Sequence, residues 1–512
     1  MVNFNNILSI IIWLPIIIGL LVLLINNKYL NKFTVLIGIV NFVFSLLLLR
    51  NFDILKHSWQ FIENYQLIPT LGINYSLGVD GFSVVLIALS CFINLLILIA
   101  GFNYNKDNSI ISFDSSSRYR ACFLIMNGLI NGILTSTNAL LFYMFFEAML
   151  IPLFLIIGIW GGINRIYAAI KFFLYAFAGS MLFLIAIIYL YKIAINAGIE
   201  PIKAFELQNF YLLKLSLKQQ VYLFVAFLIA FAIKVPMVPL HTWLPDAHTE
   251  APTSGSVILA AITLKLGAFA MLRFLLPITT EACFLLSKFM IWMSVIAIIY
   301  IGFIAVVQSN LKRLIAYSSI AHMGFVTMGM FVGVQLIQVQ DINLAIASFN
   351  GSLVQMLSHG LISAGLFFSA GVLYDRMQTN KIKEFAGIVS PMPIFAVLFM
   401  LFCLANVSLP GTSGFVGELL VILASFKYNM LVATLAATSM ILSVSYTLWM
   451  YKKVVFGIPN AHINFLSDLN SKETLILGML ALLILLFGVW PAPILDILNN
   501  SILDLIKIME HK

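Results

Sequence analysis

The sequence predicts an all-α protein that crosses a membrane many times. Its 512 residues are 62% hydrophobic and 9% charged, and its mean hydropathy is +1.06, far outside the range of soluble domains. Apolar runs recur along the whole chain, and about fourteen of them approach the roughly 20 residues that cross a bilayer. Two runs are interrupted by proline or glycine close to a charged residue. Together these observations indicate a polytopic helix bundle.

Each apolar run is expected to form one membrane helix. The predicted spans are 7–25, 33–49, 81–101, 121–136, 139–160, 166–191, 221–244, 254–276, 284–307, 315–333, 344–373, 392–426, 430–455 and 474–489. The lysines and arginines between the spans favour an arrangement with both termini outside. Residues 50–79 are expected to form a long external segment. Residues 494–509 predict an amphipathic helix that faces the membrane interface or a partner.

The first apolar run predicts a retained membrane helix. It contains Trp13 and Pro15, and the first lysine, Lys28, comes only after it. This order differs from that of a cleaved signal peptide or an import presequence. A mitochondrial location would therefore require synthesis inside the organelle.

The composition also excludes several functions. The net charge of +8 is spread over loops, so we expect no binding to nucleic acid. No C-x-x-C pair is present, so neither an iron–sulfur cluster nor a structural zinc is expected. The four cysteines are Cys91, Cys122, Cys283 and Cys403. The glycine-rich run 411–417 follows no strand, and there is no P-loop, so the chain is expected to bind no nucleotide.

The seventh span is predicted to be a broken helix. Lys234 stands in its apolar run, and Pro236 and Pro239 follow. Proline cannot donate a backbone hydrogen bond, so the carbonyl groups of Ala232 and Val235 lose their helical partners. Open backbone at membrane depth survives only where it is buried in protein or lines a wet cavity. A broken helix beside a buried charge therefore suggests an ion or proton site.

The twelfth span contains a second break. Residues 406–418 (NVSLPGTSGFVGE) combine proline, glycines and small residues, and they end on Glu418. Because the two breaks lie five helices apart, we predict two inverted five-helix repeats with helices 7 and 12 broken. The predicted divisions of the chain are 1–110, 115–277, 282–456 and 473–512.

Few ionisable residues lie inside the predicted spans, and the charged ones that suggest a function are Glu147, Lys234, Lys265 and Glu418. A charge at the centre of a bilayer costs roughly 2.5–3.5 kcal/mol, so an apolar residue would be cheaper unless the charge has a function. A lysine beside a movable carboxylate can bind and release a proton, which predicts proton transfer at these positions. The alternative is that Glu147 and Lys234 form a structural ion pair.

Histidines extend the set of candidate proton carriers. His322 and His359 lie in the tenth and eleventh spans, where a relay and a satisfied core hydrogen bond are both compatible with the sequence. His241 and His248 lie near the end of the broken seventh helix. They offer too few ligands for a metal, so a relay or a packing role is expected.

These residues resemble a known family. Residues 234–256 (KVPMVPLHTWLPDAHTEAPTSGS) resemble the signature of the antiporter-like membrane subunits of respiratory complex I and their Mrp relatives. Residues 248–252 (HTEAP), residues 356–368 (MLSHGLISAGLFF) and a glutamate at Glu418 are similar to the M-type (chain 4) branch of that family. Residues 75–81 (YSLGVDG) resemble the family's entry to the third helix. The resemblance covers essentially the whole chain.

The resemblance implies a proton pathway along the membrane midplane. It pairs Glu147 with Lys234, joins the half-channels through Lys265, continues through His322 and His359, and ends at Glu418. It also implies the two inverted repeats.

The resemblance further implies a proton-translocating membrane-arm subunit of NADH:ubiquinone oxidoreductase, an enzyme whose NADH, FMN, iron–sulfur clusters and ubiquinone are bound by other subunits. The expected neighbours are chain 2 and chain 5 type subunits and the lipid bilayer. A subunit of an Mrp-type sodium/proton antiporter and a purely structural spacer remain alternatives. The expected location is the mitochondrial inner membrane, with a bacterial plasma membrane as the alternative.

Overall fold

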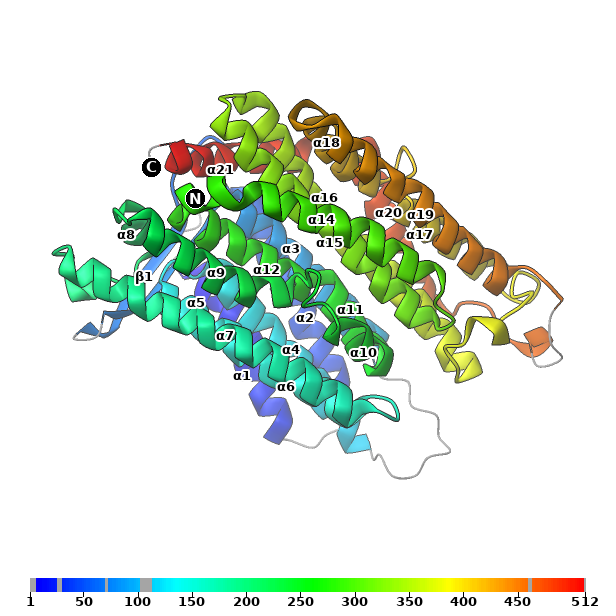
Figure 1. Cartoon of the computed structure of the whole chain (residues 1–512). Helices are drawn as coiled ribbons and strands as arrows, with labels where there is room; N and C mark the ends of the chain where they lie inside the picture. The colour runs from blue at the N-terminus through cyan, green and yellow to red at the C-terminus, as the bar shows by residue number, and fades with distance from the viewer. Residues whose placement is uncertain (1–5, 25–29, 70–71, 102–112, 459–462, 511–512) are drawn as a thin grey trace. The chain divides into compact units, whose positions relative to one another are not determined.

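The computed structural model describes residues 6–24, 30–69, 72–101, 113–458 and 463–510 (Figure 1). The chain divides into two compact units. Unit 1 takes in Met1–Lys234, Lys265–Leu285 and Ile497–Lys512, and unit 2 takes in Val235–Leu264 and Leu286–Asp496.

Unit 1 is built mainly of helices, as the sequence predicts. In it α1 packs on α4, α2 on α3, and α7 on both α6 and α9. Its helices are α1 (Ile7–Leu24), α2 (Leu30–Asn51), α3 (Gly81–Ala100), α4 (Phe113–Thr135), α5 (Ala139–Ala148), α6 (Leu150–Trp160), α7 (Arg165–Asn196), α8 (Leu207–Leu212), α9 (Leu217–Lys234), α12 (Leu264–Ala270, from Lys265 on), α13 (Leu276–Ile278) and α21 (Ala492–Glu510, from Ile497 on).

Unit 1 also contains a β-hairpin that the sequence analysis did not foresee. Strands β1 (Gln60–Ile68) and β2 (Ile73–Val79) pair antiparallel within the segment expected to be a long external loop. Glu63 of β1 accepts hydrogen bonds from the backbone N–H groups of Leu8 (2.8 Å) and Ser9 (3.2 Å). Because the first N–H groups of a helix have no partner within it, this carboxylate caps the start of α1.

The amphipathic tail forms α21, but its apolar face is not available to lipid or a partner. Leu498, Ile502 and Met509 are buried within the chain. Ser501 Oγ accepts a hydrogen bond from Gly81 N (2.9 Å). A side chain at Gly81 would meet the carbonyl oxygen of Ile497 at 2.1 Å, so glycine is needed for this close approach. The prediction of an interfacial or partner-facing helix is therefore wrong for its apolar face.

Unit 2 is organised around two long, deeply buried helices, α15 and α16. The two pack on each other, and α16 also contacts α17, α18 and α20. The helices of unit 2 are α10 (Trp243–Glu250), α11 (Thr253–Ile258), α14 (Thr280–Val306, from Leu286 on), α15 (Leu311–Gln338), α16 (Ile342–Met377), α17 (Pro393–Asn406), α18 (Ser413–Tyr428), α19 (Met430–Val455) and α20 (Ser471–Val489).

Among the described residues, 12 helices are long and apolar enough to cross a membrane. Two predicted spans are not among them. Span 121–136 lies in α4, and span 392–426 is split between α17 and α18, which have 14 and 16 residues. The count of about fourteen and the inverted repeats therefore stay predictions.

Both predicted breaks are present. The first helix of each pair ends where the sequence analysis expected: α9 at Lys234, before the two prolines, and α17 at Asn406. The chain resumes as α10 at Trp243 and as α18 at Ser413. The first break thus separates helices of 18 and 8 residues, and the second separates helices of 14 and 16 residues.

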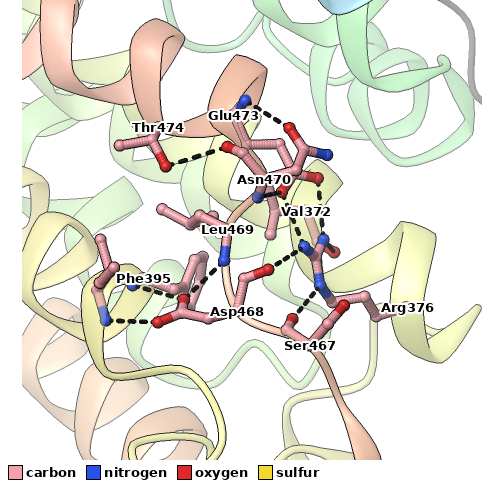
Figure 2. A network of polar contacts seen from close by, with 10 residues as sticks. Val372, Arg376, Phe395, Ser467, Asp468, Leu469, Asn470, Glu473 and Thr474 are labelled. Carbon is pink, nitrogen blue, oxygen red and sulfur yellow. Dashed lines mark hydrogen bonds and ion pairs between the residues drawn. The ribbon is translucent and has the colours of Figure 1, made fainter.

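A polar network in unit 2 holds the start of α17 in place (Figure 2). Arg376, in the last turn of α16, makes a two-pronged ion pair with Glu473 at 2.7 and 3.0 Å. Its other N–H groups donate to the carbonyl oxygens of Ser467 and Asp468. The Asp468 carboxylate accepts from the backbone N–H groups of Ile394 (2.8 Å) and Phe395 (3.2 Å), and so caps α17. The network therefore joins the ends of α16, α17 and α20.

We predict that Arg376→Met lowers the free energy of unfolding by about 3 kcal/mol, because Glu473 would be left partly buried without its partner. Thermal unfolding of the solubilised protein measures the change. Lys381→Met is the matched control, since Lys381 and Glu384 form an exposed pair at 3.3 Å and its loss should not be measurable. Equal destabilisation by the two variants would contradict the role given to Arg376.

Candidate functional site

Glu147 lies at an interruption between two helices of unit 1. Helix α5 ends at Ala148 and α6 begins at Leu150, so the carboxylate is in the last turn before the interruption. Pro152 has no N–H to give to the carbonyl of Ala148, which explains why α5 stops there. The sequence predicted a single span over 139–160, and Ala139–Trp160 is long and apolar enough to cross a membrane as one. The local interruption at Met149 was not predicted.

Lys234 is the last residue of α9 and only 2% of it is exposed. Its ammonium group lies over the ring of Phe146, 4.9 Å from the centroid, and 5.8 Å from the centroid of Phe172. Cations over aromatic faces are attracted to the ring, but this attraction does not replace hydrogen bonds. Within the described part of unit 1, Nζ has no hydrogen-bond partner. The structure therefore buries this amine without satisfying it.

Glu147 and Lys234 lie in one neighbourhood without direct contact. Phe146, which precedes Glu147, is the ring nearest to the ammonium group, and the two charged groups interact electrostatically. The buried oxygen of Glu147, Oε2, lacks a hydrogen-bond partner among the described residues. A tight structural ion pair would have closed both vacant hydrogen-bonding positions. Because Nζ has no hydrogen-bond partner among the described residues, Glu147 and Lys234 do not form a hydrogen-bonded ion pair in this structure.

Lys265 belongs to a span with two π-helical turns. It lies in α12, between a π-turn at Leu259–Thr263 and another at Met271–Leu275, and it is 1% exposed. Each π-turn adds a residue to the helical repeat, so it rotates the side chains that follow and weakens the local hydrogen-bond ladder. The sequence placed Lys265 correctly near the middle of a helix. It carried no signal for the π-turns.

Glu418, His322 and Gln355 form a buried cluster in unit 2. Glu418 Oε1 lies 2.7 Å from His322 Nδ1 and accepts a hydrogen bond from Gln355 Nε2 at 3.0 Å. The three side chains come from α18, α15 and α16. His359, on α16, has its ring centroid 5.9 Å from that of His322. The structure thus brings together three residues that sequence analysis selected separately and adds Gln355, which lies one turn before His359.

The two other histidines occupy the region of the first break. His241 lies in the turn between α9 and α10, and both it and His248 are buried. The ring of His248 stacks on Phe367, with centroids 4.6 Å apart and 10° between the planes. This contact fits the packing role that was one of the two expectations for His248.

Two basic residues near helix ends are buried and bonded within the protein. Arg273 pairs with Asp80 at 2.5 Å and donates to Ser83 Oγ at 3.1 Å. Lys312 donates to the carbonyl oxygen of Ala251 at 2.9 Å. Both side chains therefore have hydrogen-bond acceptors inside their own units.

No group of three or more histidine, cysteine or acidic side chains that could hold a metal ion occurs among the described residues. The cysteines Cys91, Cys122, Cys283 and Cys403 are all buried. The carboxylate, amine and imidazole groups described above are groups that can bind and release protons.

Comparisons with known proteins all point to one family of membrane subunits. Residues 136–443 match the family model described as NADH:quinone oxidoreductase/Mrp antiporter, transmembrane. The chain is 42% identical over 510 residues to NADH-quinone oxidoreductase subunit M of Rickettsia prowazekii (strain Madrid E), covering 98% of each protein. It is 41% identical over 510 residues to NADH-ubiquinone oxidoreductase chain 4 of Marchantia polymorpha, again covering 98% of each.

Solved structures match over nearly the full length. A chain in the structure of respiratory complex I from Thermus thermophilus with bound NADH gives a TM-score of 0.84 at 28% identity, covering 98% of this chain and 99% of that one. A chain of the Mrp complex from Dietzia sp. DQ12-45-1b gives a TM-score of 0.83 at 15% identity, covering 99% of both. The second likeness shows a shared fold alone.

We predict that Lys234→Met leaves the protein at least as stable as the natural chain. A thioether of similar volume keeps the packing on Phe146 and removes an amine without hydrogen bonds. Lys234→Ala should instead cost about 2 kcal/mol or more, because it opens a cavity. Thermal unfolding of both variants in native membranes makes the comparison. If methionine destabilised as much as alanine, the lysine would be a structural requirement.

Proposed function

Because the chain belongs to the NADH:quinone oxidoreductase/Mrp antiporter membrane family, we propose that it is a proton-translocating membrane-arm subunit of NADH:quinone oxidoreductase, respiratory complex I. Relatives at 41–42% identity over the full length, named as subunit M and chain 4 of that enzyme, support this proposal. Electron transfer takes place in other subunits, which bind NADH, FMN, the iron–sulfur clusters and ubiquinone. This chain contributes proton movement.

One observation carries the proposal, namely the buried amine of Lys234. It stands at the end of a broken helix near Glu147 and has no hydrogen-bond partner among the described residues. An apolar side chain would be more stable there, so the lysine is retained for chemistry. A neighbouring carboxylate favours the charged ammonium when it is close and ceases to do so when it moves away. A change in the distance between Glu147 and Lys234 therefore makes the amine bind or release a proton.

The proton path continues from this switch. Quinone reduction elsewhere in the assembly alters neighbouring subunits, and these alter the separation of Glu147 and Lys234. The proton released from Lys234 passes by way of Lys265 toward His359, His322 and Glu418. Moving each proton against 100 mV costs about 2.3 kcal/mol, so the redox reaction must supply the free energy.

The proposal also specifies a setting. Chain 2 and chain 5 type antiporter-like subunits are the neighbours in the membrane arm. The mitochondrial inner membrane is the proposed location, with the chain encoded in the organelle. Relatives from Rickettsia and from a plant support both an organelle and a bacterial plasma membrane as sites for proteins of this kind.

We predict that Glu147→Gln, Lys234→Ala and Glu418→Gln each reduce proton translocation by the assembled complex at least roughly tenfold, a change of ~1.4 kcal/mol in the barrier. NADH oxidation with quinone and proton uptake into vesicles are measured together. Glu281→Gln is the control, because it makes the same exchange at an exposed carboxylate in the first turn of α14.

Two outcomes would contradict the proposal. Unchanged turnover and pumping in all three variants would exclude a proton-carrying role for these residues. Recovery of the chain in an assembly that exchanges sodium for protons and oxidises no NADH would favour the Mrp-type antiporter instead.

A further inference from the structure

A small cavity lies beside the Glu418–His322 pair, entirely within unit 2. Its polar wall consists of His322, Glu418, Ser439, Ser443 and Tyr446, and the remaining lining is apolar or glycine. The space is large enough for about one water molecule, and several polar groups converge on it, as a buried water requires.

Helix α19 supplies the hydroxyl side of this cavity. Ser439, Ser443 and Tyr446 are spaced by four and three residues, so they share one face of the helix. All three are buried, whereas Ile441 and Trp449 of the same helix are exposed. These three hydroxyl groups therefore face the interior of unit 2, on the side of the charged pair.

The imidazole of His322 has one satisfied and one unsatisfied nitrogen. Nδ1 lies 2.7 Å from Glu418 Oε1, but Nε2 has no hydrogen-bond partner among the described residues. Only 6% of the residue is exposed. A buried ring nitrogen left without a partner is unfavourable in either protonation state, so a ligand that can both donate and accept is expected at this position.

Tyr446 is held so that its hydroxyl group can serve such a ligand. It lies 3.1 Å from Ser318 Oγ, and either oxygen can be the donor. Asn406, the last residue of α17 before the second break, donates to Ser318 Oγ at 3.1 Å and to Thr447 Oγ1 at 2.9 Å. The Tyr446 oxygen can therefore offer the cavity a proton or a lone pair, according to the direction of its bond with Ser318.

We propose that this cavity is a water-binding site that hydrates the Glu418–His322 pair, and that Tyr446 is its positioning residue. The water accepts from Nε2–H when the imidazole is protonated and donates to Nε2 when the imidazole is neutral. Reversal of the Tyr446–Ser318 hydrogen bond matches the water in both cases. The pair can thus change its charge without leaving a buried polar atom unsatisfied.

The inference rests on the proposed function, because hydration matters here only if the pair changes its protonation state during turnover. It goes beyond that function by assigning a role to α19 and to the polar residues behind Tyr446. No residue of α19 is among those that the sequence analysis selected.

The test replaces Tyr446 by phenylalanine in the assembled complex, and Tyr451→Phe is the matched control. Tyr451 is on the same helix and is also buried, but its hydroxyl group donates to the carbonyl oxygen of Ala396 at 3.1 Å and does not line the cavity. We expect Tyr446→Phe to lower the number of protons translocated per NADH oxidised, and to slow coupled turnover roughly tenfold through loss of a hydrogen bond beside a charged pair. Tyr451→Phe should change neither.

A second variant keeps the inference testable if the complex that carries Tyr446→Phe does not assemble. Ser443→Val puts an apolar group into the cavity and leaves the hydroxyl group of Tyr446 in place, so it should lower the same proton-to-NADH ratio. A merely structural defect would reduce the amount of assembled complex but not the ratio. If both variants assemble and keep the natural ratio, the inference is overturned.

Glu418→Gln, assayed in parallel, separates this inference from the proposed function. If Glu418→Gln stops pumping while Tyr446→Phe and Ser443→Val pump normally, the water site is contradicted and the proposed function is supported. If all three variants pump normally, the water site and the proposed function are both contradicted. A density map of the assembled complex that shows no water in the cavity would also overturn the inference.

Discussion

The whole structure depends on one constraint: a polar group at membrane depth must find its partner inside the protein. A continuous helix meets this demand for its own backbone, whereas a broken one leaves carbonyl groups open. The chain breaks helices at Lys234 and at Asn406. Asn406 donates hydrogen bonds to Ser318 and Thr447, whereas the buried amine of Lys234 has no hydrogen-bond partner among the described residues. Lys234 stands where the partial negative charge of a helix C-terminus favours a cation. The end of the broken helix therefore lowers the cost of burying that charge.

The same constraint separates structural from functional charges. Arg273 with Asp80 and Arg376 with Glu473 are tightly bonded pairs, and arginine keeps its proton under all ordinary conditions. Such pairs hold helices and loops together. Lys234 and His322 carry groups that can release a proton, and each retains a buried nitrogen without a hydrogen-bond partner among the described residues. Stability is given up at the positions where protonation can change.

The sequence revealed features that depend on local chemistry and missed those that depend on distant contacts. Prolines located both breaks, and charges in apolar runs located Glu147, Lys234, Lys265 and Glu418. The pairing of strands β1 (Gln60–Ile68) and β2 (Ile73–Val79) was missed because no apolar alternation dominates either strand. The Arg273–Asp80 pair was missed because its two residues are 193 positions apart in the chain. The π-turns around Lys265 left no mark, since their residues are ordinary helix formers.

Lys234 and the Glu418–His322 pair stabilise charge by different means, and this difference affects how the protonation state of each can change. Lys234 has aromatic faces and a helix end near it but no hydrogen bond from Nζ among the described residues, so in the proposed mechanism the distance to Glu147 controls its charge. Glu418 accepts from Gln355 and contacts His322, so its charge is held by direct bonds and cannot be changed by distance alone. Neutralising the Glu418 carboxylate requires a proton to reach the Glu418–His322 pair itself. A pair that is held by direct hydrogen bonds therefore needs neighbouring groups that can both donate and accept, and hydroxyl groups and water do so.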